Sequence, residues 1–419
     1  MNRSLHKWLT TSFFNLFIVA FLGVVLRYKI AFYLPFVQQK FLLHSHSHFA
    51  FSGWITQTLM VLLIHHISLH CNEHALKRYQ WLLYANLFSA YGMLISFIIQ
   101  GYAFFSITFS TLSIIVSYFF AFYYWKDLNT LLRNKISSAW LKAALAFSVI
   151  SSAGPFFLAY LMIAKISDQH LYLSSIYFFL HFQYNGWFFF AGMGLLISKL
   201  EHIPGSFSSF KTALVLFFVA AFPAYFLSVL WLPLPLMAQI LIVIAVVCQL
   251  LGWAFMVKFF TKNKIFIKTR FSKYGRILLL LSAIAFSLKL LLQAASVHPA
   301  LSQLTYGFRP IIIGYLHLVL LAVISIFIVG YIVSFDLVRI THTLLIGISI
   351  FVVGVIINEF FLMIQGIEAL QYRSVHHINE LLFAAAIILF SGIATMFISS
   401  VKSFNRDIAQ YKTPIIILS

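Results

Sequence analysis

Three histidines at alternate positions, His44, His46 and His48, stand directly before a long apolar stretch of the chain. Histidine is the commonest metal ligand among the side chains, and it is costly to place inside a lipid bilayer. A histidine cluster at the start of an apolar segment therefore indicates a candidate metal or cofactor site. The competing interpretation is that these side chains are simply solvated at a membrane interface.

Two further histidines are spaced regularly after this cluster. His181 follows His48 by 133 residues, and His317 follows His181 by 136 residues. The segments 48–54 and 181–187 agree at His, Phe, an aromatic residue, Gly and Trp, whereas the third copy, from His317, keeps only the histidine and the apolar character. A fixed period of this kind predicts that the chain contains three related units.

The composition shows which kind of element must carry these histidines. Of the 419 residues, 62% are hydrophobic and only 9% are charged, and 48 are Phe. This balance is that of an integral membrane protein rather than a soluble domain. Because the apolar runs are much longer than the strands of a membrane barrel, we expect an all-α polytopic fold.

Apolar windows of membrane-spanning length predict twelve transmembrane helices in a single domain, 1–419. The predicted spans are 10–34, 46–70, 79–100, 103–125, 139–164, 170–198, 209–230, 235–258, 275–296, 309–333, 342–365 and 379–401. The histidine period then equals four helices. We therefore predict a pseudo-threefold arrangement of four-helix units, approximately 1–135, 136–270 and 271–419, in which the second, sixth and tenth helices are equivalent.

The basic residues predict the orientation of the chain. If the N-terminus is cytoplasmic, 21 of the 28 Lys and Arg residues lie in cytoplasmic segments. Such a bias favours cytoplasmic N- and C-termini in a bacterial-type cytoplasmic membrane. The same bias explains the formal charge of +19, because basic residues in cytoplasmic segments lie next to the anionic surface of the lipid bilayer. The lipid bilayer is therefore the expected partner, and nucleic acid is not expected.

Twelve helices with three histidines near the outer ends of the second, sixth and tenth resemble the large subunit of the haem-copper oxidase superfamily, which includes the nitric oxide reductases. In that family a low-spin haem is clamped between a histidine of the second helix and one of the tenth. The resemblance implies that His48 and His317 bind a low-spin haem b. His44 shares a helix face with His48 and stands in reserve, whereas His46 points away.

The sequence departs from the family where a second metal would bind. The predicted span 209–230 contains no histidine, although the family carries an adjacent pair there. Tyr315 occupies the place of the tenth helix's first histidine. His181 is followed by Asn185 and Gly186 where the nitric oxide reductases have Glu and Gly. A single low-spin haem is thus better supported than a second centre with copper or another iron.

Several other residues are candidates for the same site. His181, with His376 or His377 in place of the missing histidine pair, is a candidate ligand of a second metal. Arg309 and Arg373 are candidate partners of the haem propionates. For His181, a hydrogen-bonded cluster that ties helices together is an equally good interpretation. The arginines and the adjacent histidines are equally explained as solvated loop residues.

We therefore expect a membrane haem protein that transfers electrons and takes them from a partner subunit or a cytochrome. Reduction of oxygen or nitric oxide, and hence an oxidoreductase activity, requires a second metal centre, and no catalytic residue is assigned. Glu359 is the one acid and Lys289 the one base expected to be embedded. One alternative function is a transporter or channel that uses Lys289 and Glu359. A second alternative is a haem-free scaffold or assembly protein.

Overall fold

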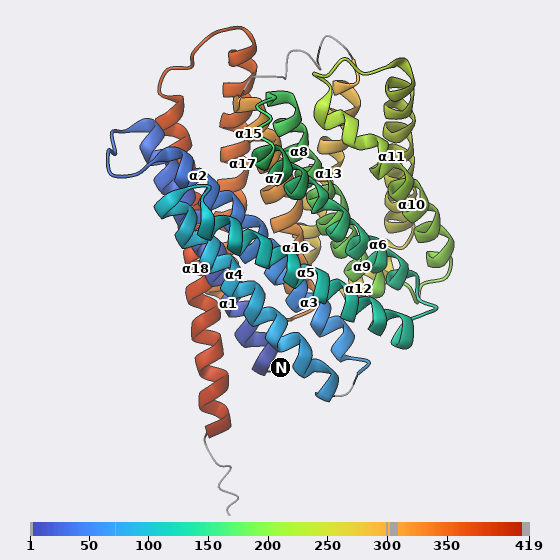
Figure 1. Ribbon diagram of the computed structural model, residues 1–419. Helices are drawn as coiled ribbons and strands as arrows, with labels where there is room; N and C mark the ends of the chain where they lie inside the picture. The colour runs from blue at the N-terminus through green and yellow to red at the C-terminus, as the bar shows by residue number, and fades with distance from the viewer. Residues whose placement is uncertain (1–2, 72, 299–300, 302–308, 413–419) are drawn as a thin grey trace, which may run out of the picture.

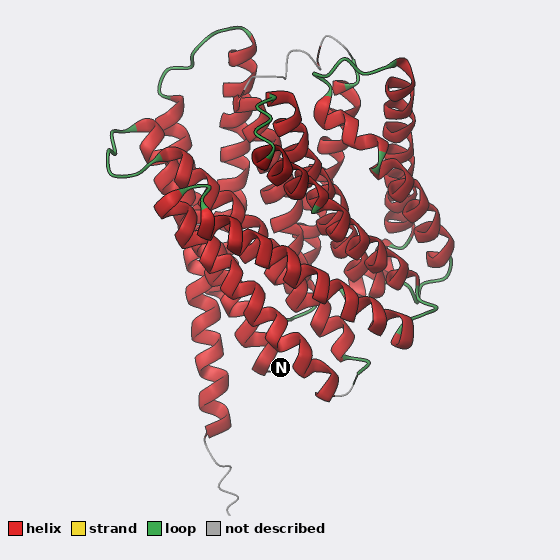
Figure 2. Ribbon diagram, viewed as in Figure 1, coloured by secondary structure: helices red, strands yellow, loops and turns green. Residues whose placement is uncertain are grey.

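The computed structural model describes residues 3–71, 73–298, 301 and 309–412. Within these ranges the chain is helical apart from short connections, and it forms no strand (Figures 1 and 2). The predicted all-α class is confirmed.

The helices follow one another with few residues between them. The first part of the chain forms α1 (Arg3–Ala31), α2 (Gln39–Phe49), η1 (Ala50–Thr56), α3 (Gln57–Ser68), α4 (Glu73–Gln100) and α5 (Phe104–Leu131). The middle part forms α6 (Ile136–Ser151), α7 (Ala153–Ile163), α8 (Gln169–His181), η2 (Phe182–Phe188), α9 (Phe189–Ser198), α10 (Ser206–Ala221), η3 (Pro223–Val229), α11 (Leu236–Lys262) and α12 (Lys264–Arg270). The last part forms α13 (Lys273–Ser296), α15 (Arg309–His317), η4 (Leu318–Ser325), α16 (Ile326–Ser334), α17 (His342–Leu370) and α18 (Ile378–Lys412).

The described helices are those of a multi-pass membrane protein. Ten are long and apolar enough to cross a bilayer, or eleven when the bent pair α10 and η3, with an angle of 48°, counts as one span. The predicted span 170–198 is present as a continuous helix through α8, η2 and α9 but is not among these. Gln183 and Asn185 in its middle lower its mean hydropathy. The short helix α12 is an addition that the hydropathy pattern did not predict.

Three π-helices interrupt the helices that carry the regularly spaced histidines. The π-helix η1 begins two residues after His48, η2 directly after His181, and η4 directly after His317. A π-helix takes up an extra residue per turn and so rotates the side chains before it relative to those after it; such segments are frequent at functional sites. The three positions of the sequence repeat thus share a local backbone structure as well.

The three π-helices lie at the centre of the bundle and contact one another. The indole N–H of Trp54 in η1 donates to Ser325 Oγ in η4 over 2.9 Å, and that of Trp187 in η2 donates to Thr56 Oγ1 in η1 over 3.4 Å. Most residues of η1, η2 and η4 are buried, whereas only 22% of the residues in the apolar window of α5 are. The three π-helices are therefore central, and helices such as α5 are peripheral.

Close helix packing explains the glycine that the first two repeats share. A Cβ on Gly186 would lie 2.5 Å from Phe147 Cβ, and one on Gly53 would lie 2.6 Å from the ring of Phe49. Neither distance is sterically allowed, so a larger residue at either position requires the neighbouring aromatic ring to move. These glycines let α6 and the Phe49 ring approach the π-helices closely.

Both ends of the described chain lie at the same end of the bundle, which we call the terminal side (Figure 1). Helix α1 starts there, and α18 runs past the bundle on that side. Helices α2, α8 and α15 begin at the opposite side. The histidines of all three helices therefore lie in the half of the bundle that is remote from the termini.

Candidate functional site

His44 and His48 lie on the face of α2 that packs against the end of α4. The ring of His48 stacks on Phe97 with a centroid distance of 4.4 Å, and its Nε2 is 2.9 Å from the hydroxyl of Tyr102. His44 packs edge-on against Tyr102 at 4.6 Å. The two histidines share a face, as their four-residue spacing predicts, but that face points toward α4 and not toward α15.

Tyr102 forms a hydrogen bond with the Nε2 atom of His48. It lies in the turn between α4 and α5, and burial raises the pKa of its phenol to about 12. The phenol therefore keeps its proton at neutral pH, and the tautomer of His48 sets the direction of the hydrogen bond between the phenol and His48 Nε2. This nitrogen is then occupied by a hydrogen bond inside the protein.

His46 lies on a different face of α2, against α1. Its Nδ1 is 3.1 Å from the carbonyl oxygen of Val19, and a Cβ on Gly23 would lie 3.5 Å from its Cε1. A carbonyl only accepts hydrogen bonds, so Nδ1 carries the proton and donates it. The lone pair of the ring is then on Nε2, which has no hydrogen-bond partner among the described residues.

His317, at the end of α15, has the same arrangement. Its Nδ1 donates to the carbonyl oxygen of Ile313 over 2.8 Å, which leaves the lone pair on Nε2. Every residue from Pro310 to His317 is partly accessible, over two turns of helix, whereas most of η4 and α16 is buried. One side of α15 packs against α17, where a Cβ on Gly366 would lie 3.2 Å from Ile311. The Nε2 atoms of His46 and His317 keep some accessible surface.

Four polar side chains from four helices form what we call the embedded polar cluster: Arg27 of α1, His46 of α2, His317 of α15 and Glu359 of α17. His317 is within electrostatic reach of Arg27 and His46, and Glu359 is within reach of Arg27. Val19, Gly23 and Arg27 follow one face of α1, which is the face that meets His46. The cluster brings together two imidazoles with free Nε2 atoms, one cation and one acid.

His181 makes two hydrogen bonds and is fully buried. Its Nε2 is 2.8 Å from the carbonyl oxygen of Ala221, at the end of α10, and therefore donates. Its Nδ1 accepts from the side-chain amide of Asn185 over 3.1 Å. Next to it, the Gln183 amide donates to Ser151 Oγ of α6 over 2.8 Å. These contacts tie α6, α10 and η2 together and leave His181 without a nitrogen for a metal.

The remaining candidates for a second metal lie elsewhere. The rings of His376 and His377 are 4.0 Å apart in the exposed connection before α18, and His377 Nδ1 is 3.4 Å from Glu380. The structure does not bring them to His181. Among the described residues no group of three or more His, Cys, Asp or Glu side chains is placed to hold a metal ion. Arg309 and Arg373 are exposed.

Lys289 and Glu359 belong to different parts of the bundle. Lys289 of α13 is buried, with 3% exposure, among η2 and η4, and its Nζ lies 5.3 Å from the centre of the Phe286 ring. Glu359 accepts a hydrogen bond from Asn358 and faces Arg27. The described structure shows no ion pair between Lys289 and Glu359, so the two do not form a shared ion site.

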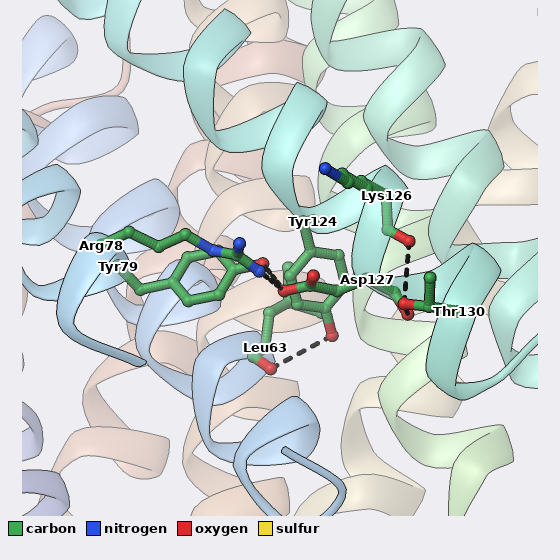
Figure 3. A network of polar contacts seen from close by, with 7 residues as sticks. All are labelled: Leu63, Arg78, Tyr79, Tyr124, Lys126, Asp127 and Thr130. Atoms are coloured by element: carbon green, nitrogen blue, oxygen red, sulfur yellow. Dashed lines mark hydrogen bonds and ion pairs between the residues drawn. The ribbon is translucent and has the colours of Figure 1, made fainter. Parts of the chain in front are cut away.

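A polar network joins α3, α4 and α5 (Figure 3). The carboxylate of Asp127, which is buried, pairs with the guanidinium of Arg78 and accepts a hydrogen bond from Tyr79 over 2.5 Å. The hydroxyl of Tyr124 donates to the carbonyl oxygen of Leu63 over 3.1 Å. The network connects α4 and α5 to α3. The Asp127 carboxylate has two partners within the protein, whereas Arg78 Nε has no hydrogen-bond partner among the described residues. The pairing of Asp127 is the arrangement of a structural contact.

We expect Asp127→Asn to lower the stability of the protein by about 1–3 kcal/mol, because it leaves Arg78 without its anion. Partial exposure of Arg78 keeps the effect below that of a fully buried pair. The melting temperature of the detergent-solubilised protein measures the change. Asp336→Asn is the control, since Asp336 is exposed and Asn tolerates its positive φ of 49°. Equal melting temperatures for the two variants would contradict the assignment.

The structure corrects the expectation that Glu359 and Lys289 are the one acid and the one base inside the bundle. Arg27 is half-buried in the embedded polar cluster, and Asp127 is buried beside Arg78. Arg27 had a signal in the sequence, because it falls within the predicted span 10–34. Asp127 had none, since its partner Arg78 is 49 residues away in the chain.

No protein-family model matches the chain, and no curated protein sequence is similar to it.

Proposed function

We propose that the protein is a membrane haem protein of the haem-copper oxidase fold, with a low-spin haem b held between α2 and α15. His317 and His46 are the two iron ligands in this proposal. His46 replaces His48, which the spacing favoured, because His48 faces Tyr102 on the other side of α2. The role of the protein is electron transfer within a bacterial-type cytoplasmic membrane.

One observation carries the proposal: two imidazoles from different helices each bond Nδ1 to a backbone carbonyl and keep Nε2 free. Iron-ligating histidines have this arrangement, because the bond at Nδ1 fixes the tautomer and the ring orientation. The residues therefore fit a six-coordinate haem, which supplies one-electron transfer when it is bound.

The other members of the embedded polar cluster set the charge around the two histidines. Arg27 places a positive charge within reach of both rings, and Glu359 places an acid within reach of Arg27. A cation near the ligands favours a negatively charged propionate or the reduced form of a centre. Glu359 partly compensates this charge and so limits the cost of burying Arg27.

The residues do not fit a second metal centre. His181 uses both ring nitrogens, and its Nε2 bonds to Ala221, in the helix where the family carries two histidines. We therefore propose no reduction of oxygen or nitric oxide.

The proposal also includes twelve membrane spans, where α8 to α9 counts as one span and α10 to η3 as another. The spans form a pseudo-threefold arrangement around η1, η2 and η4, and the terminal side is cytoplasmic. The recurrence of a π-helix in all three units supports that arrangement.

A reduced-minus-oxidised visible spectrum of the purified protein, combined with iron and copper analysis, tests this function. We expect a low-spin b-type spectrum, one iron per protein and no copper. The protein must be produced in cells with ample haem. Absence of both iron and the haem band would overturn the proposal and would leave the embedded polar cluster as an ion site of a transporter or channel.

A further inference from the structure

A second buried site, separate from the embedded polar cluster, surrounds Lys289. A cavity of about 10 Å³ lies where η2, α13 and η4 meet. We call it the Lys289 chamber; its walls include Tyr184, Asn185, Phe286, Lys289, Val319 and Val323. A cavity of this size holds one species as large as a water molecule.

The elements around the chamber contain no acidic side chain that could neutralise Lys289. No Asp or Glu occurs between Asp168 and Glu201, or between Glu201 and Asp336, and these two stretches contain η2, α13 and η4. The ion pairs of the described residues join Arg78 to Asp127, Lys135 to Glu201 and His377 to Glu380. A buried ammonium without a counter-charge is strongly unfavourable, so Lys289 either loses its proton or has a compensating charge beside it.

The chamber also has a hydrogen-bond donor that could bind an anion. The Asn185 amide nitrogen uses one N–H for His181 and has a second one available. Phe189 and Phe286 line the chamber and stack on each other with an interplanar angle of 6°, and Val319, Val323 and Ile324 complete its apolar walls. The charge, the remaining donor and the small volume all select a small anion.

We propose that the Lys289 chamber binds one small monovalent anion, of the size of fluoride or chloride, as the counter-ion of Lys289. The anion occupies the position between helices where the fold has no carboxylate. It holds η2, α13 and η4 together through a single charge contact. This site is independent of haem binding, since none of the residues of the embedded polar cluster lines it.

The test compares the melting temperature of the protein in fluoride, chloride, iodide and gluconate at constant ionic strength. Anything that binds only the folded state stabilises it in proportion to the logarithm of its concentration. We expect the melting temperature to rise with the logarithm of the fluoride or chloride concentration, and no such rise with gluconate or iodide, which are too large for the chamber. A melting temperature independent of the halide would overturn the proposal and would indicate an uncharged Lys289 beside a water molecule.

Two variants locate the effect. Lys289→Met removes the charge, and Val323→Ile keeps the charge but fills the cavity with an added methyl group. Both variants should lose the halide response, whereas Lys211→Met, at an exposed lysine of α10, should keep it. If Lys289→Met fails to fold, Val323→Ile alone decides. An unchanged halide response in Val323→Ile would exclude the chamber as the site. Iron content is measured on the same samples, so loss of haem and loss of halide binding are distinguished.

Discussion

His317→Ala is expected to abolish the low-spin haem signal and to reduce the iron content of the purified protein far below one per chain. His317 is the one histidine of α15, and in the proposed site it is an iron ligand whose tautomer is fixed by the carbonyl of Ile313. Changes to the groups that merely orient a ligand already weaken metal binding by about 10–100-fold. Removal of the ligand itself must have a larger effect, because it also leaves the iron without a sixth partner.

The measurement is the reduced-minus-oxidised spectrum together with iron analysis, at equal protein concentration. His376→Ala is the matched control, since His376 is exposed in the connection before α18 and should leave both quantities unchanged. An elution profile in detergent identical to that of the wild type shows that the variant is folded. A six-coordinate spectrum that survives in His317→Ala would show that α15 does not carry an iron ligand.

The helical class and the approximate positions of the apolar helices could be predicted from the sequence. Long apolar windows identify membrane helices because the bilayer imposes a minimum length, so each predicted span overlaps a helix of the structure. The regular spacing of His48, His181 and His317 marks three helices that each continue into a π-helix near the histidine. The pseudo-threefold arrangement of three units stays a prediction.

The π-helices could not be predicted from the sequence. A π-helix differs from an α-helix by one residue per turn, and no residue pattern marks it in η4, where Leu318–Ser325 is wholly apolar apart from its last residue. The rotation that each π-helix introduces is set by packing between helices, such as the bond from Trp54 to Ser325. Contacts of this kind join residues far apart in the chain, and they become visible only in the folded structure.

The choice between His46 and His48 depended on the same kind of information. On an α-helix the two residues point about 200° apart, so one faces α1 and the other faces α4. Helical spacing pairs His48 with His44 but does not say which face meets α15. The position of α2 between α1 and α4 decides it, and that position follows from packing across the whole bundle.

A direct comparison of His46→Ala with His48→Ala tests which face of α2 serves the haem. We expect His46→Ala to lose the six-coordinate spectrum, because His46 carries a free Nε2 within electrostatic reach of His317. We expect His48→Ala to keep that spectrum, since His48 Nε2 is already bonded to Tyr102. Iron content should fall in the first variant and stay near one per chain in the second.

The two variants are well matched, because each removes one partly accessible imidazole from the same helix. Tyr102→Phe adds a third measurement, as it releases His48 Nε2 without changing the ring and should leave the haem spectrum unaltered. The reverse outcome, in which His48→Ala loses the signal and His46→Ala keeps it, would assign the ligand to the face of α2 that carries His44. It would require α2 to rotate relative to α1 when haem binds, since only rotation can bring His48 from Tyr102 toward α15.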